Sequence, residues 1–173
     1  MLKFSILNAF RRKVIAVTAI IGTALGIALM TVLLSISDGM DAEMSPNMDV
    51  FHSFLLIVAL VAAVAGGFSI FIVMLMSVIE RTREFGILKA SGWSNFNVIG
   101  SVVGQSVTVG LLGAATGLLI GCGVLQAINS YLTIDIGVIT WRLVLIIVSF
   151  GVAMGITGGL YPALRAARVS PVE

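Results

Sequence analysis

The stretch ERTREFGILKASG, from Glu80 to Gly92, lies between long apolar segments and holds five of the chain's charged residues, which number ten basic and eight acidic. Side chains charged at this density need water, so the stretch must lie outside the apolar surroundings that the flanking segments require. The mixture of acidic and basic side chains also suggests that it meets a partner there. We interpret it as a docking element, to which the rest of the chain is attached as a membrane-embedded unit.

Composition supports a membrane location for the flanking segments. Of the 173 residues, 59% are hydrophobic and 10% are charged, and the mean hydropathy is +1.16. Ordinary soluble domains carry about 25% charged residues, and a soluble core of this size cannot bury so much apolar surface. The sequence therefore predicts an all-α polytopic membrane protein.

Four apolar runs are long enough to cross a bilayer, because a helix rises about 1.5 Å per residue and the hydrocarbon core is about 30 Å thick. Residues 1–13 show an apolar and a polar face at helical spacing, which predicts an amphipathic helix on the membrane surface. The predicted spans are residues 14–37, 50–79, 95–130 and 141–161. The other predicted segments are a short external loop at 38–49, the charged segment at 80–94, a second external loop at 131–140 and a tail at 162–173.

The distribution of Lys and Arg predicts the orientation in the membrane. With both termini and the charged segment in the cytoplasm, only Arg142 remains on the outside, and such an excess of basic residues on one side is typical of the cytoplasmic side. The acidic loop 38–49 then faces outward. The basic residues placed in the cytoplasm are Lys3, Arg11, Arg12, Lys13, Arg81, Arg83, Lys89, Arg165 and Arg168.

Glycines recur at four-residue spacing in three of the four predicted spans. Small residues at this spacing leave a smooth groove in which two helix backbones approach closely. Such a groove serves either packing within one subunit or an interface between two subunits, and the sequence leaves both open. The positions are Gly22, Gly26, Gly113, Gly117, Gly121, Gly151, Gly155 and Gly159.

The predicted spans offer little chemistry. None has Asp, Glu, Lys or Arg in its interior, whereas proton relays and ion sites usually need such residues at membrane depth. One His, one Cys and no polar cluster give no basis for a catalytic pair or a metal site, and no GxxxxGK[ST] loop is present to bind ATP. We therefore predict no catalytic, cofactor-binding or metal-binding residues. The basic residues beside the spans are better explained as determinants of membrane orientation than as a nucleic-acid-binding site.

Helical spacing within the charged stretch predicts a short helix that a partner recognises. Phe85 and Leu88 lie one turn apart and are expected to fill a groove on a soluble partner, and Gly92 is expected to end the helix. The alternative is a solvated loop whose charges only fix the topology. The residues spaced for local ion pairs on a helix are Glu80, Arg81, Arg83 and Glu84.

Two segments resemble the signature patterns of FtsX/MacB-type ABC transporter permeases. ERTREFGILKASGW, residues 80–93, is similar to the pattern that this family carries between its second and third spans. GLYPALRAARVSPVE, residues 159–173, is similar to the family's C-terminal pattern. Four spans, cytoplasmic termini and an N-terminal surface helix fit the same plan, so the resemblance covers nearly the whole chain.

The resemblance implies that the segment 80–94 contains a coupling helix that docks on a separate ABC-type ATPase. It further implies a homo- or heterodimeric permease with two ATPase copies, which bind the ATP and Mg²⁺, in the inner membrane of a prokaryote. The chain itself would then be no enzyme. The residues expected at the ATPase contact are Glu80, Arg81, Arg83, Glu84, Phe85, Gly86 and Leu88.

One feature departs from the family's pattern. Members usually carry a large extracytoplasmic domain between their first two spans, where this sequence has only residues 38–49, too few to fold alone. Either the chain is a natural minimal member or the domain has been excised. The leading hypothesis is export or extraction of a hydrophobic or amphiphilic substrate. The alternatives are an ATP-driven signalling subunit that moves no substrate, and a four-helix membrane protein without an ATPase.

Overall fold

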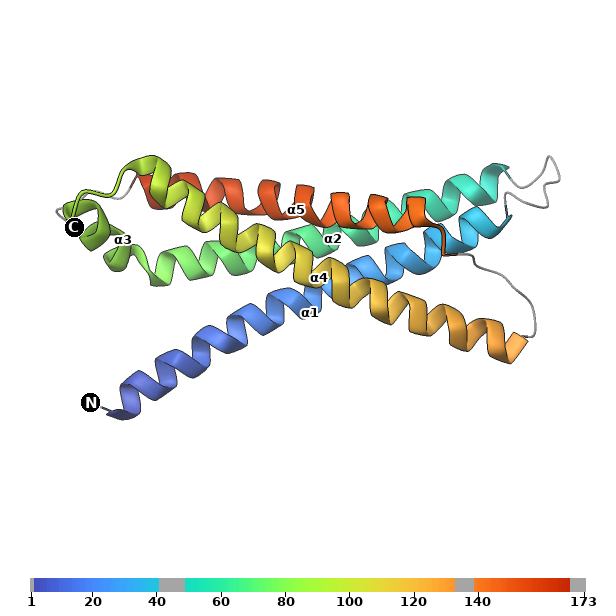
Figure 1. Ribbon diagram of the computed structural model, residues 1–173, viewed down its shortest axis with the longest axis horizontal. Coiled ribbons are helices and arrows are strands. Elements are labelled where there is room, and N and C mark those ends of the chain that lie inside the picture. Colours follow the sequence, from blue (N-terminus) through green and yellow to red (C-terminus); the bar gives the residue numbers. More distant parts are fainter. Residues whose placement is uncertain (1, 41–48, 133–138, 169–173) are drawn as a thin grey trace.

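The computed structural model describes residues 2–40, 49–132 and 139–168, and its regular structure in these residues is entirely helical (Figure 1). Four of the helices are long and apolar enough to cross a membrane, which confirms the predicted class and the four candidate spans. The helices are α1 (Leu2–Met40), α2 (Asp49–Glu80), α3 (Thr82–Ala90), α4 (Asn95–Leu132) and α5 (Trp141–Ala167).

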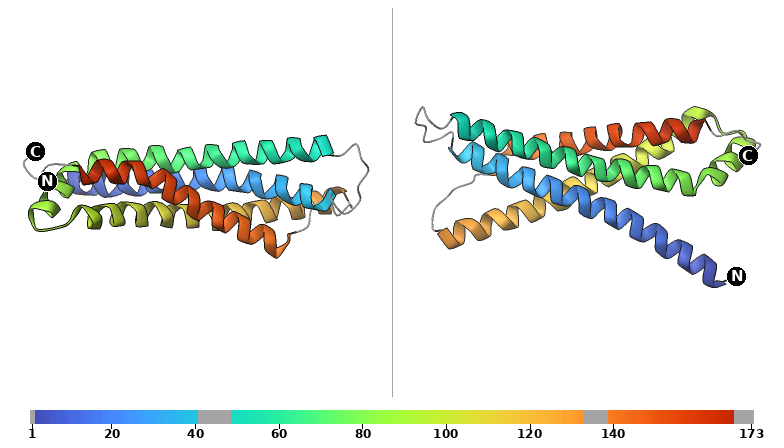
Figure 2. Two further views of the ribbon diagram at one scale, coloured as in Figure 1. Left: turned by 90° about the horizontal axis from the view of Figure 1, so that it is seen from above. Right: turned by 180° about the vertical axis from the view of Figure 1, so that it is seen from behind.

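The four long helices form a bundle in which α1 contacts α2 and α4, and α5 contacts the same two helices from the other side. The start of α1, the short helix α3 and the end of α5 share one end of the bundle, here called the α3 end (Figure 1). Toward this end, α1 diverges from α2 and α5, as Figure 2 shows from behind. With an even number of spans, both termini of the chain lie on the same side of the membrane. That this side is the cytoplasm stays a prediction.

Two predicted boundaries differ from the helices observed. Residues 1–13 were expected to form a separate surface helix, but α1 runs from Leu2 to Met40 without a break, and its amphipathic role stays a prediction. The fourth span was expected to end at Tyr161, but α5 continues through Pro162 to Ala167. Proline interrupts a helix by removing one hydrogen bond and crowding the preceding turn. Tertiary packing sustains the helix here, because Pro162 and Ala163 are fully buried.

Most of the two predicted external loops and the end of the tail lie outside the described residues. For the loop 38–49 this concerns residues 41–48, and for the loop 131–140 it concerns residues 133–138. Residues 169–173, which carry the last part of the C-terminal pattern, also lie outside. The structure does show that α1 extends beyond the predicted span to Met40 and that α2 begins at Asp49.

A regular row of glycines joins α4 to α1. A Cβ built on Gly113 would collide with Thr23, one on Gly117 would lie 2.8 Å from the Ile27 Cβ, and one on Gly121 would lie 2.8 Å from the Thr31 Cβ. The three α1 residues follow one another at four-residue spacing, as do the three glycines. One ridge of α1 therefore fits a side-chain-free groove of α4 over about two turns.

The other glycines at four-residue spacing lie at the interface between α1 and α2 and at the interface between α4 and α5. On α1, Gly26 lies against the α2 backbone, so that a Cβ there would be 2.7 Å from the Ala62 carbonyl oxygen, and Gly22 lies against Ser69. On α5, Gly151, Gly155 and Gly159 lie against α4. All eight positions singled out in the sequence thus face another helix of the same chain. The glycine rows are occupied by packing within the chain and leave no free groove there for a second subunit.

Hydroxyl groups at these interfaces bond to their own helices. Thr23 Oγ1 donates to the Ala19 carbonyl oxygen at 2.8 Å, and Thr31 Oγ1 donates to the Ile27 carbonyl oxygen at 2.7 Å. Each hydroxyl is thereby satisfied one turn back along its own helix. Toward α4, Thr31 presents its Cβ and Cγ2 to Gly121, whereas Thr23 presents its Oγ1 to Gly113. Among the described residues, no buried side-chain nitrogen or oxygen lacks a partner, as an apolar surrounding requires.

Replacing Gly155 by Ala should lower the stability of the bundle by about 1–3 kcal/mol, the usual effect of overpacking. The new Cβ would lie 2.7 Å from the Val107 Cα and 2.9 Å from the Ser106 carbonyl oxygen, and these backbone atoms move only if α4 moves. We expect a lower melting temperature of the purified protein in detergent. The matched control is Gly104→Ala on α4, whose Cβ meets no atom within 4 Å. Equal melting temperatures for the two variants would contradict the close packing.

Candidate functional site

The charged stretch forms α3, a separate helix at the end of the bundle. The helix follows α2 after a turn at Arg81, whose φ and ψ of −105° and 11° are not those of a regular helix. Thr82 Oγ1 donates back to the Ile79 carbonyl oxygen at 2.9 Å, and the Phe85 amide donates to the Arg81 carbonyl oxygen at 3.1 Å. These bonds connect the two helices directly and limit their independent movement.

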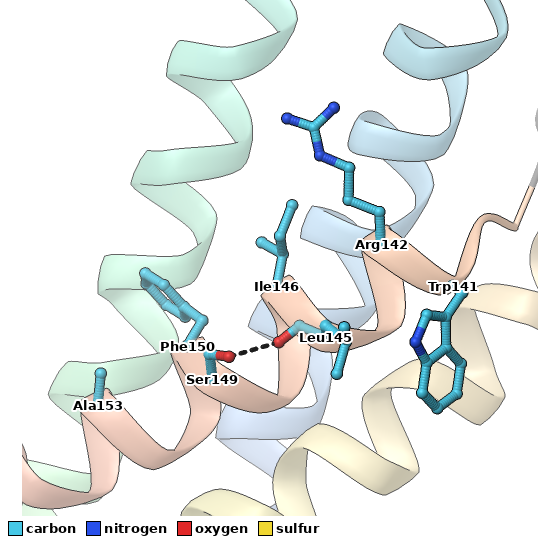
Figure 3. A pocket seen from close by; sticks show the side chains of 7 residues that line it. All are labelled: Trp141, Arg142, Leu145, Ile146, Ser149, Phe150 and Ala153. Carbon is cyan, nitrogen blue, oxygen red and sulfur yellow. Dashed lines mark hydrogen bonds between the residues drawn. The ribbon is translucent and has the colours of Figure 1, made fainter.

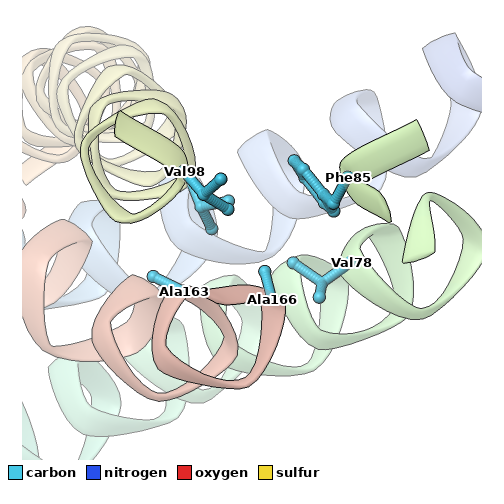
Figure 4. Close-up of a cluster of buried hydrophobic side chains, with 6 residues drawn as sticks. Val78, Phe85, Val98, Ala163 and Ala166 are labelled. Carbon is cyan, nitrogen blue, oxygen red and sulfur yellow. The ribbon is translucent and has the colours of Figure 1, made fainter. Parts of the chain in front are cut away.

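One side of α3 is packed into the bundle. Phe85 is only 7% exposed and lies in an apolar cluster that contains Val78 of α2 and Val98 of α4 (Figure 4). Ala163 and Ala166 of α5 complete the side of the cluster that faces α5. A large aromatic ring thus connects the short helix to three long ones.

This position corrects the role that the sequence suggested for the two apolar residues of α3. Phe85 and Leu88 were expected to enter a groove on a partner, but Phe85 is buried, and Leu88 is half-buried against the same cluster. The apolar surface of the neighbouring helices takes up both side chains, because removing apolar surface from water is favourable. They anchor α3 to its own bundle.

Lys89 lies near the same inner side and joins α3 to α5. Its ammonium group donates a hydrogen bond of 2.7 Å to the carbonyl oxygen of Ala167, the last residue of α5. The final carbonyls of a helix have no partner within the helix, and a cation is favoured beside them because the helix dipole is negative there. In the sequence, Lys89 counts among the basic residues that predict the orientation, and nothing in its spacing indicates this contact with α5.

The end of α3 is a Schellman motif, which confirms the stop predicted at Gly92. The Gly92 amide donates to the Lys89 carbonyl oxygen at 3.0 Å, and the Trp93 amide donates to the Leu88 carbonyl oxygen at 3.1 Å. Gly92 has a φ of +100°, which residues with a Cβ rarely adopt. The chain can therefore reverse direction within a few residues and begin α4 at Asn95.

The opposite side of α3 is exposed and carries Arg83, Glu84 and Ile87, here called the outer row. Both charged residues are exposed, and the Ile87 side chain is 64% exposed. Ile87 was not among the residues expected at a partner contact, although its spacing of four residues from Arg83 places it on the same helix face. Two charged residues and one apolar residue are thus exposed side by side on this face of α3.

The remaining residues expected at the contact are placed less uniformly. Glu80 is exposed at the end of α2, whereas Arg81 and Gly86 are half-buried. The local ion pairs expected from the spacing do not form for Glu80, Arg83 or Glu84 with any described residue, since the turn at Arg81 interrupts the helix on which the spacing was counted. Charges without a local partner remain available to another protein.

The few His, Cys, Asp and Glu side chains among the described residues lie apart from one another. No three His, Cys, Asp or Glu side chains among them lie close enough to hold a metal ion. His52, at the end opposite α3, shares a hydrogen bond of 2.8 Å between its Nδ1 and the Ser37 Oγ, which joins α1 to α2. This His is placed for helix packing.

Comparison with known proteins gives a consistent match. The family described as FtsX-like permease C-terminal matches residues 56–171. The macrolide export ATP-binding/permease protein MacB of Syntrophobacter fumaroxidans is 34% identical over 118 residues, which cover 68% of this chain and 16% of the relative. The uncharacterized ABC transporter permease MJ1507 of Methanocaldococcus jannaschii is 30% identical over 135 residues, which cover 75% of this chain and 34% of the relative.

A third relative extends the comparison to another bacterium. The uncharacterized ABC transporter permease YknZ of Bacillus subtilis is 33% identical over 119 residues, which cover 67% of this chain and 29% of the relative. The chain thus spans between about a sixth and a third of the length of these relatives. The matched range 56–171 includes most of α2 and all of α3, α4 and α5.

Replacing Phe85 by Ala should loosen α3 from the bundle, because a buried aromatic ring contributes about 3 kcal/mol to packing. We expect the backbone amides of α3 to exchange with deuterium at least about tenfold faster, as local opening becomes easier. The matched control is Ile87→Ala on the same helix, which removes a mostly exposed side chain and should leave the exchange rates unchanged. Faster exchange in both variants alike would show that the two sides of α3 do not differ.

Proposed function

Because the chain belongs to the FtsX-like family of ABC transporter permeases, we propose that it is a transmembrane subunit that couples ATP hydrolysis by a separate ATPase to movement of its helices. The observation that carries this proposal is the two-sided placement of α3. Its inner side is anchored to the bundle through Phe85 and Lys89, whereas its outer row is exposed at the end of the molecule.

The outer row is the proposed contact with the ATPase. Arg83 and Glu84 carry opposite charges and have no described partner, so that a complementary pair on the ATPase can set the register of docking. Ile87 lies between them and the end of the helix and supplies apolar contact area. Force applied to this row passes to α2 through the turn at Arg81 and to α5 through Lys89.

The remaining features of the assembly are proposed on the family's plan. Two ATPase copies hold the ATP and Mg²⁺, and a second permease subunit, identical or related, completes a dimer in the inner membrane of a prokaryote. The α3 end then faces the cytoplasm. Because the eight interfacial glycines pack within the chain, the second subunit would contact other surfaces of the bundle.

The proposed output is export or extraction of a hydrophobic or amphiphilic compound. It is supported by the name of the MacB relatives, which are macrolide export proteins. An ATP-driven signalling subunit is the alternative and would use the same docking helix. A reconstituted complex of chain and ATPase separates the two, since only an exporter changes the leaflet of a fluorescent amphiphile when ATP is added.

Exchanging the two outer-row charges, as Arg83→Glu together with Glu84→Arg, should weaken binding of the ATPase at least about tenfold. The double exchange keeps the net charge of the segment, so that the membrane orientation has no reason to change, but it places like charges opposite those of the ATPase. Co-purification of the chain with its ATPase from membranes measures the effect.

Two control variants make this result specific. Arg83→Lys keeps the charge and should retain most of the binding, and Asp38→Asn alters an exposed charge at the opposite end of the bundle and should retain all of it. Undiminished co-purification of the double variant would remove α3 as the docking site. Loss in the Asp38 variant as well would point to a general effect of charge.

A further inference from the structure

A groove of about 580 Å³ runs along the first half of α5 on the outside of the bundle, between Trp141 and Ala153 (Figure 3). All of its lining residues belong to α5, so the groove is shallow and open on the outer side of the bundle. From Arg142 to Ala153 the helix rises roughly 16 Å, which is about half of the hydrocarbon thickness of a bilayer. The groove therefore has the length of one lipid leaflet and begins at the end of the bundle opposite α3.

The groove is apolar except at its start. Leu145, Ile146 and Phe150 line its length, and the one hydroxyl group there, that of Ser149, donates to the Leu145 carbonyl oxygen at 2.6 Å (Figure 3). Ser149 is thus already satisfied by its own helix. Among the described residues that line the groove, Arg142 alone is charged, and Figure 3 shows it near the start of α5.

The charge of Arg142 has no counterpart in the described part of the chain. Neither an ion pair nor a hydrogen bond joins this guanidinium to another described residue. Beside it, the Trp141 side chain is 73% exposed, and Trp is favoured at the boundary between lipid tails and headgroups. The order of features along α5 matches that of an anionic lipid. The exposed Trp141 and the Arg142 without a described partner lie where the headgroup would be, and the apolar groove follows where an acyl chain would be.

We propose that this groove binds an anionic phospholipid, with the phosphate on Arg142 and an acyl chain along Leu145, Ile146 and Ala153. Guanidinium groups bind phosphate oxygens in a bidentate fashion, and the acyl chain needs no polar partner. The site lies at the other end of α5 from the proposed ATPase contact. Its occupation therefore does not depend on whether an ATPase docks on α3.

The charges of the segments that follow or precede the helix ends here do not favour such binding, which makes the proposal specific. In sequence, the two segments 38–49 and 131–140 contain five acidic residues and no basic one. Like charges repel one another over about a Debye length. A preference for an anionic lipid beside Trp141 would therefore have to arise from Arg142 in its groove.

The test uses the full chain in phospholipid vesicles and the fluorescence of Trp141. The chain has two tryptophans, so that a Trp93→Phe background leaves Trp141 as the single reporter at the groove. Brominated phosphatidylglycerol and brominated phosphatidylcholine quench a tryptophan only when they lie beside it. We expect phosphatidylglycerol to be preferred about fivefold, the effect of one Arg at a membrane surface.

The variants locate the preference. Arg142→Gln should abolish it, Arg142→Lys should retain much of it and thereby show that the fold is kept, and Arg168→Gln at the other end of the same helix should leave it unchanged. Equal quenching by both lipids in the parent, or a preference that survives Arg142→Gln, would overturn the proposal. Absence of quenching by either lipid would also overturn the proposal, because a second copy or another segment of the chain would then cover the groove.

Discussion

Close approach of helix backbones is the constraint on which this bundle depends. In lipid, no hydrophobic driving force brings two apolar helices together, so that van der Waals contact and interhelical fit decide the packing. Here a helix that has glycine at every fourth position packs against a helix that has larger residues at the facing positions. At one such interface, Thr23, Ile27 and Thr31 of α1 lie over the glycines of α4. Replacing these glycines by alanine would add a Cβ at each position. Whole helices would then have to move, because many of the facing atoms belong to the backbone.

The same tight packing gives α3 a firm base. A nine-residue helix is too short to be stable alone, and its stability must come from what it contacts. Phe85 reaches α2, α4 and α5 in one cluster, and the Lys89 ammonium group bonds to the last turn of α5. A displacement of α3 would therefore reach several spans together.

Much of this architecture could be predicted from the sequence, since charge and length decide where a chain can cross a membrane. The charged segment at Glu80 separates two long apolar runs, and Gly92 marks the end of the short helix that it forms. The resemblance to the permease family was carried by the same segment. The four candidate spans and the helix stop follow from local chemistry.

Other features depend on contacts between residues far apart in the sequence and could not be read from spacing. Phe85 was assigned to a partner, because nothing local shows that it shares a buried cluster with Val98 and Ala163. Pro162 suggested an end to the last helix, and only the packing of α4 against α5 explains why the helix continues. The glycine spacing is compatible with packing within the chain and with pairing of two subunits. Only the facing residues on the neighbouring helices show that these glycines pack within the chain.

The division of α3 into two sides also bears on how such a subunit can diverge. Residues on its inner side are tied to three other helices, so that a change there demands compensating changes in several places. Arg83, Glu84 and Ile87 contact little within the chain and can vary one at a time without disturbing the fold. Gene duplication could thus yield subunits with one inherited membrane bundle and different soluble partners, distinguished by a few exchanges on a single helical face.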